Sequence, residues 1–203
     1  KTLVETTVQR LDAGASKQDG AFSWFTPPRL LNEYSRGEFK DGYYNLGVAH
    51  GSPGVVGFLA ICLETGEGGA AVAELLDGSV EWLLPHLSGN DQDGIHAFVD
   101  PRGTPSPRPR VSWCYGDLGV SVVLARAARA ASRSDWAELA ASAGTRAAAR
   151  IPADDAVQDS GLCHGSAGNA HLFRKLHESL GLEQFAEARD AWTRRTLARR
   201  GAD

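Results

Sequence analysis

The chain has 203 residues, of which 42% are hydrophobic and 23% charged, a composition typical of a globular domain. A formal net charge of −4 and a pI near 5.9 give no electrostatic support for binding nucleic acid or an anionic membrane surface. The sequence contains no N-terminal signal and no apolar run approaching the roughly 20 residues that span a bilayer. We therefore expect a single-domain cytoplasmic protein with no integral membrane segment and no nucleic-acid partner.

Cysteine and methionine usage adds two expectations. Three cysteines, an odd number, argue against a disulfide framework and favour reduced thiols with individual roles. The sequence begins at Lys1 and contains no methionine, so we expect it to be an internal portion of a longer protein.

Helical patterns dominate the chain from its start to its end. Apolar residues recur at three- to four-residue spacing, or small apolar and charged residues alternate in strongly helix-forming runs. Helices are predicted over residues 3–11, 55–63, 70–84, 120–131, 136–150, 170–180 and 184–200. The short run 95–99 is the one segment that looks like a strand. Because the helix over 55–63 is almost wholly apolar, we expect it to be buried on most sides.

Two connecting segments are rich in proline. Residues 23–28 form an aromatic loop stiffened by two prolines, and residues 100–110 contain four prolines, which cannot continue a helix. The second segment is either a plain linker or a loop on the rim of a binding face. Its composition alone favours the linker.

A Gly-x-x-Gly pattern occurs three times, beginning at Gly51, Gly116 and Gly165, and an apolar helical run follows each one. The spacings of 65 and 49 residues leave room for two helices and two loops in each unit. Helix pairs repeated in this way build a closed or curved array, because one pair cannot bury its own apolar face. We therefore predict an all-α fold, an α/α toroid (α/α barrel) of helix pairs with glycine-rich turns. The apolar helices after the turns would form the inner ring and the more charged helices the outer ring.

Potential metal ligands lie beside two of these turns, at Cys114, Cys163 and His164. Zinc favours thiolate and imidazole ligands, and catalytic zinc sites use three protein ligands while leaving one position open. Equivalent turns at one end of a ring would bring these residues together. However, the sequence contains no Cys-x-x-Cys pair, and the cysteines could equally be small buried hydrophobic residues.

Other residues near the turns have less specific patterns. On sequence alone, His50 is best explained as a helix-start residue bonded to backbone, but at the ring position of the ligands it becomes a candidate acid/base group. Tyr115 and Asp117 are possible neighbours of a substrate bound at the same site. Alternatively, they would cap a helix or lie on the rim of the ring. Cys62, inside the apolar helix, is expected to pack in the core. Surface or core roles are also expected for the remaining histidines, His86, His96, His171 and His177.

Three segments in order make the chain resemble the lanthionine synthetase C-like family of lanthipeptide cyclases. They are residues 42–51 (GYYNLGVAHG), 112–116 (SWCYG) and 161–165 (GLCHG), and residues 24–28 (WFTPP) upstream also look similar to bacterial members. The resemblance covers essentially the whole chain.

The resemblance implies an α/α toroid in which Cys114, Cys163 and His164 bind zinc and His50 is the acid/base residue beside the metal. The implied reaction is addition of a peptide cysteine thiol to dehydroalanine or dehydrobutyrine, which forms a lanthionine or methyllanthionine thioether ring. The implied partners are a dehydrated precursor peptide with its leader and a lanthipeptide dehydratase.

The sequence departs from the family in its extent. Family members are typically about twice this length, and the repeat that carries their additional catalytic carboxylate lies upstream of the His-Gly motif and is missing here. The final repeat is missing too, so we expect a domain over residues 1–203 that lacks flanking repeats at both ends.

Two alternative functions share the same fold. One is a zinc protein that binds or adds another thiol such as glutathione, and the other is a noncatalytic toroid that keeps zinc for structure. Three protein ligands with an exchangeable position would favour an enzyme, and a fourth protein ligand would favour the scaffold.

Overall fold

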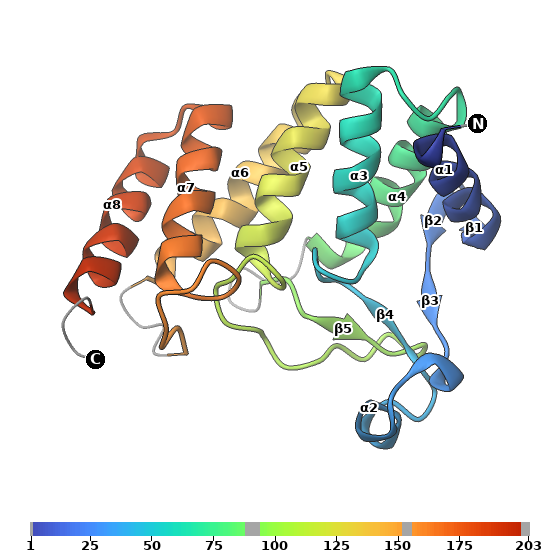
Figure 1. The fold of residues 1–203 in the computed structure, drawn as a ribbon, viewed down its shortest axis with the longest axis horizontal. Coiled ribbons are helices and arrows are strands. Elements are labelled where there is room, and N and C mark those ends of the chain that lie inside the picture. The colour runs from blue at the N-terminus through green and yellow to red at the C-terminus, as the bar shows by residue number, and fades with distance from the viewer. Residues whose placement is uncertain (1, 88–93, 152–155, 200–203) are drawn as a thin grey trace.

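The computed structural model describes residues 2–87, 94–151 and 156–199, which form helix pairs flanked by two small sheets (Figure 1). The helices are α1 (Leu3–Gly14), α2 (Glu33–Glu38), α3 (Ser52–Thr65), α4 (Ala71–Leu87), α5 (Asp117–Ala131), α6 (Ser134–Ala149), α7 (Ser166–Leu180) and α8 (Glu183–Ala198). The strands are β1 (Ser16–Gln18), β2 (Ala21–Ser23), β3 (Phe25–Thr26), β4 (Tyr43–Asn45) and β5 (Phe98–Val99).

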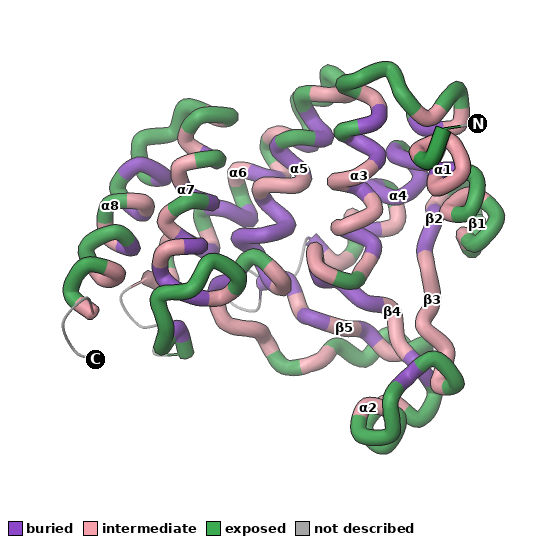
Figure 2. Tube along the Cα trace, viewed as in Figure 1, coloured by how far each residue is buried: buried purple, intermediate pink, exposed green. Residues whose placement is uncertain are grey.

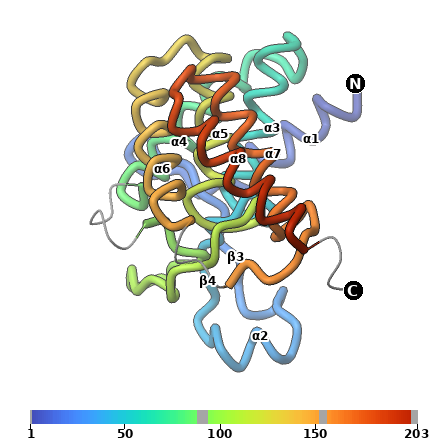
Figure 3. The backbone as a smooth tube through the Cα atoms, turned by 90° about the vertical axis from the view of Figure 1, so that its left-hand side faces the viewer, coloured from blue at the N-terminus to red at the C-terminus, as the bar shows by residue number. Residues whose placement is uncertain are grey.

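The helices after the three glycine turns form one layer of the molecule. Helix α5 lies between α3 and α7 and contacts both, while α4, α6 and α8 pack against α3, α5 and α7, respectively (Figures 1 and 3). The predicted all-α fold of repeated helix pairs is therefore confirmed, with helix ends that differ from the predicted ones by a few residues. The short helix α2 was not predicted. Helices α1 and α8 lie at opposite ends of the array (Figure 1).

The core lies between the two layers, because each helix turns one apolar face toward the other layer. Helices α3, α4 and α5 each carry several buried positions, drawn in purple in Figure 2. Cys62 is among them, with 2% of its surface exposed, so the prediction that it packs in the core is confirmed. The largest fully buried side chains include Trp192, Phe173, Phe185, Leu59, Leu75, Leu118 and Leu124.

The expectation of one short strand at residues 95–99 was incomplete. Strand β5 does fall within that run, but β1 and β2 form an antiparallel hairpin, and β3, β4 and β5 form an antiparallel sheet in that order. Each strand has only two or three residues, too few to display the alternation that reveals a strand in a sequence. The sheet matters for function because β4 leads directly into the first glycine turn.

The proline-rich segment 100–110 is fixed to the body of the protein, which contradicts the plain-linker interpretation. The hydroxyl oxygen of Ser106 accepts hydrogen bonds from the backbone N–H groups of Ala97 and Phe98, at 3.1 and 3.0 Å. The N–H of Asp100 donates to the carbonyl of Thr104 at 2.9 Å. The segment thus forms a tight loop beside β5 and delivers the chain to the turn that contains Cys114.

Candidate metal centre

Each Gly-x-x-Gly turn brings a backbone carbonyl against the first turn of the following helix. The carbonyl always belongs to the residue six positions before the second glycine. A Cβ on that glycine would collide with the carbonyl oxygen. The collision distances would be 2.3 Å for Gly54 and Val48, 2.1 Å for Gly119 and Trp113, and 2.0 Å for Gly168 and Leu162. Because only glycine allows such an approach, the repeated glycine has one structural cause in all three turns.

The same register is repeated in the hydrogen bonds between turns. The N–H of Val48 donates to the carbonyl of Cys114 at 2.9 Å, and the N–H of Trp113 donates to the carbonyl of Cys163 at 3.2 Å. Ala49, Cys114 and Cys163 therefore occupy equivalent positions in successive turns. The residues that follow them, His50, Tyr115 and His164, are equivalent in the same way.

This register brings three predicted metal ligands together. The sulfur atoms of Cys114 and Cys163 and a ring nitrogen of His164 all lie within 4.8 Å of one another, and Cys114 Sγ is 4.0 Å from His164 Nδ1. Zinc–sulfur and zinc–nitrogen bonds of about 2.3 and 2.0–2.1 Å place tetrahedral ligands roughly 3.5–3.8 Å apart. The donor set and its spacing therefore fit zinc with a small contraction. Among the described residues, no other group of three such side chains is close enough to hold a metal.

The surroundings of the Cys163 thiol raise its pKa and so favour its protonated form. Desolvation raises the pKa of the Cys163 thiol, the neighbouring Cys114 raises it further, and the positive charge of Arg110 opposes the change. Ser112 adds a polar contact, with its hydroxyl 3.4 Å from Cys114 Sγ. Sequence reasoning overlooked both Arg110 and Ser112, although both stand just before Cys114 in the chain.

His50 lies in the neighbouring turn and does not belong to the group of three. Its side chain is exposed, and its loop is joined to the metal-ligand loop through the hydrogen bond from Val48 to Cys114. Tyr115 is half-buried between this loop and the sheet. A Cβ on Gly47 would lie 2.3 Å from its ring, and the Tyr115 and Phe98 ring centroids are 5.3 Å apart.

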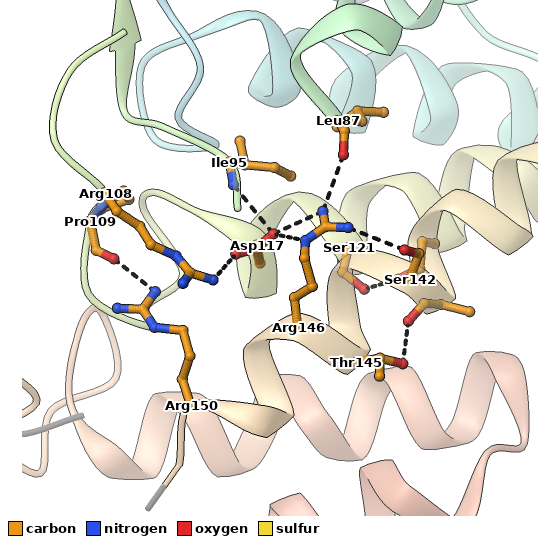
Figure 4. A network of polar contacts seen from close by, with 12 residues as sticks. Leu87, Ile95, Arg108, Pro109, Asp117, Ser121, Ser142, Thr145, Arg146 and Arg150 are labelled. Atoms are coloured by element: carbon orange, nitrogen blue, oxygen red, sulfur yellow. Dashed lines mark hydrogen bonds and ion pairs between the residues drawn. The ribbon is translucent and has the colours of Figure 1, made fainter. Parts of the chain in front are cut away.

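Asp117 has a different environment from the one expected beside a substrate (Figure 4). Only 1% of its side chain is exposed, so it offers no surface to a bound peptide. Its Oδ1 accepts hydrogen bonds from Arg146 Nε at 3.0 Å and the N–H of Ile95 at 3.3 Å, and its Oδ2 accepts one from Arg108 Nη2 at 3.3 Å. This carboxylate joins the Cys114 loop to α6, and a place for Asp117 near a substrate site stays a prediction.

The sequence profile of the "Lanthionine synthetase C-like protein" family matches residues 11–196. The chain belongs to this family. A solved structure of nisin cyclase has a similar fold, with a TM-score of 0.78 at 16% sequence identity. The match covers 95% of this chain and 50% of nisin cyclase, so the chain spans about half the length of that relative. The family resemblance and the predicted α/α toroid fold are thus confirmed. Among the described helices, none combines the length and apolar character needed to cross a membrane.

Proposed function

We propose that the protein is a zinc-dependent lanthipeptide cyclase, which adds peptide cysteine thiols to dehydroalanine or dehydrobutyrine and so forms lanthionine or methyllanthionine rings. The observation that carries this proposal is the convergence of Cys114, Cys163 and His164 from two successive turns of a lanthionine synthetase C-like fold. Three protein ligands are typical of catalytic zinc sites, whereas structural sites have four.

Cys114, Cys163 and His164 would hold the zinc ion. A free thiol has a pKa of about 8.5 and is mostly protonated at neutral pH; bound zinc supplies a position at which a substrate thiol is deprotonated. Cys163 is exposed and Cys114 and His164 are partly exposed, so this side of the site is open to a peptide. Arg110, close enough to act on the Cys163 thiol, would offset negative charge that accumulates on the sulfur atoms.

His50 would supply the proton for the second half of the reaction. The substrate sulfur forms a bond to the β carbon of the dehydrated residue, and the alkene electron pair moves toward the neighbouring carbonyl as an enolate. His50 would then donate a proton to the α carbon and take up another from solvent. An imidazole suits this step because it can both donate and accept a proton in general acid–base catalysis. The thiol proton released at the start balances the proton gained at the end.

The proposed reaction requires a dehydration reaction to come before it. The alkene acceptors arise by loss of water from serine or threonine residues, so a dehydratase must act first on a leader-bearing precursor peptide. The peptide is the macromolecular partner of this proposal, and the dehydratase is the enzyme that supplies it.

Metal analysis and ring closure test the two halves of this proposal separately. We expect about one zinc ion per chain in the purified protein, much less in Cys163→Ala, and wild-type content in the control Cys62→Ala, because Cys62 lies in the core. Unchanged zinc in Cys163→Ala would reject the ligand assignment. His50→Asn should keep its zinc and leave the thiols of a dehydrated peptide open to alkylation. Complete loss of free peptide thiols with that variant would remove His50 from the mechanism.

A further inference from the structure

An open pocket of about 340 Å³ lies directly beside the candidate metal centre. Its lining is mostly apolar and consists of Trp113, Leu162, Gly168, His171 and Leu172. Trp113 stands immediately before Cys114 and Leu162 immediately before Cys163 in the sequence. Since consecutive Cα atoms are about 3.8 Å apart, two walls of the pocket are each one residue from a candidate ligand.

Two large apolar side chains are held open to solvent at this pocket. Leu162 is 75% exposed and Trp113 is 39% exposed. They belong to different turns, and the hydrogen bond from the N–H of Trp113 to the carbonyl of Cys163 fixes one turn against the other. Single exposed leucines are common on protein surfaces, but exposed apolar side chains gathered around a hollow indicate a binding site. Gly168 lacks a side chain and Leu172 is buried, so the hollow continues down to helix α7.

His171 is the ionisable residue in the lining of this pocket. Arg174 Nη2 lies 3.3 Å from His171 Nδ1, and a guanidinium can only donate. The Nδ1 atom of His171 must therefore accept, which places the ring proton of the neutral imidazole on Nε2. This N–H suits the backbone carbonyl of an extended peptide. Apolar walls with one positioned donor are typical of sites that bind an aliphatic or aromatic side chain together with its main chain.

We propose that this pocket binds the side chain next to the reacting cysteine and selects substrate peptides with an aliphatic or aromatic residue at that position. The inference rests on the proposed function, in which the reacting thiol binds beside Cys114 and Cys163. In the peptide, the residue next to the reacting cysteine has its Cα one residue spacing away. In the protein, Trp113 and Leu162 lie at the same spacing from Cys114 and Cys163. The pocket is thus within reach of the neighbouring side chain.

Short thiol peptides without dehydrated residues separate binding from catalysis. Their affinity for the zinc-loaded protein is measured calorimetrically for Gly-Leu-Cys-Gly and Gly-Ser-Cys-Gly, and for the reversed pair Gly-Cys-Leu-Gly and Gly-Cys-Ser-Gly, all with blocked ends. We expect a leucine neighbour to improve the affinity about tenfold over serine in at least one pair, as burial of a leucine side chain predicts. Equal affinities in both pairs would overturn the inference.

Two variants locate the effect and a third serves as a control. Leu162→Ser removes one wall, and His171→Trp fills the pocket from α7 without changing a residue next to a candidate ligand. Both should bring the leucine-to-serine ratio close to one, whereas Leu30→Ser, an exposed leucine outside the pocket, should keep it. A ratio that survives His171→Trp would overturn the inference even if Leu162→Ser fails to fold.

Zinc content and thiol binding distinguish this failure from failure of the proposed function. If the protein binds no zinc, or if zinc does not improve the binding of any thiol peptide, the proposed function fails first. If zinc-dependent thiol binding is present but indifferent to the neighbouring residue, only the selective pocket is rejected.

Discussion

The backbone N–H of Trp113 donates to the carbonyl of Cys163 at 3.2 Å, in the same register in which the N–H of Val48 donates to the carbonyl of Cys114. Two successive turns are therefore fixed to one another at the residues that carry the candidate zinc ligands. The second glycine of each turn also holds this arrangement. Because it has no Cβ, the carbonyl of the preceding loop can pack closely against the first turn of the helix. These backbone contacts hold the two cysteine-bearing turns at a fixed spacing.

This arrangement predicts that Gly119→Ala disturbs both stability and metal binding. The new Cβ would lie 2.1 Å from the carbonyl oxygen of Trp113, so the loop that carries Cys114 must move. We expect the free energy of unfolding to fall by about 1–3 kcal/mol, as is usual for overpacking, and zinc affinity to fall as well. Urea denaturation and competition with a zinc-binding dye measure the two effects.

Gly57→Ala is the matched control for this substitution. Gly57 lies within α3, where a Cβ would meet Val123 at an ordinary contact distance of 3.5 Å. Because alanine is favoured over glycine inside a helix by about 0.5–1 kcal/mol, this variant should be neutral or slightly more stable and keep its zinc. Equal losses in the two variants would show that the close carbonyl contact has no special importance.

The sequence predicted the helical array and the convergence of the candidate metal ligands because both depend on patterns that repeat. Apolar spacing reports which helix faces are buried, and Gly51, Gly116 and Gly165 mark equivalent turns. Once the turns are equivalent, the convergence of Cys114 with Cys163 follows. The family resemblance added the chemistry, which the spacing of the residues alone left open.

Features formed by single contacts could not be predicted in this way. The strands β1–β5 are too short to show alternation, and the anchoring of the loop over residues 100–110 depends on one hydroxyl, that of Ser106. Asp117 was expected beside the substrate because it follows the Cys-Tyr-Gly motif. Its partners Arg108 and Arg146 come from elsewhere in the chain, and no local pattern reveals them.

The buried carboxylate of Asp117 predicts a large effect for Asp117→Asn. Arg146 and Arg108 both direct guanidinium N–H groups at it, and the Arg146 side chain is only 11% exposed. Breaking a buried pair leaves charge without its partner, so we expect a loss of about 3–5 kcal/mol in the free energy of unfolding. Because Arg108 lies in the segment that leads to Cys114, zinc affinity should fall in the same variant.

Asp135→Asn provides the comparison, since Asp135 also pairs with an arginine, Arg133, but on the surface with 57% of its side chain exposed. Exposed ion pairs contribute little to stability, so this variant should unfold like the wild type and retain its zinc. Thermal or urea unfolding of the two variants under the same conditions measures the contrast. Similar stability for Asp117→Asn and the wild type would show that the arginines do not depend on this carboxylate.

His86 predicts a pH dependence of stability that is independent of the metal centre. Its ring packs on Trp82, with the centroids 4.7 Å apart, and it shares a small cavity with His96. Burial lowers the pKa of His86, and the charge of His96 lowers it further. The folded protein therefore resists protonation at this position, whereas the unfolded chain accepts a proton near the ordinary pKa of about 6.5.

The sign of the effect follows from proton binding. Above about pH 6.5 the imidazole is neutral in both states and contributes no pH dependence. As the pH falls below that value the unfolded state binds more protons, so the free energy of unfolding decreases, by at most about 1.4 kcal/mol per pH unit for one group. The decrease stops once the pH falls below the lowered pKa of the folded state. His86→Phe keeps a ring against Trp82 and cannot be protonated, so urea unfolding between pH 7.5 and 5.5 should show a smaller loss of stability than the wild type. Parallel curves for the two proteins would mean that His86 takes up its proton as readily in the folded state as in the unfolded chain.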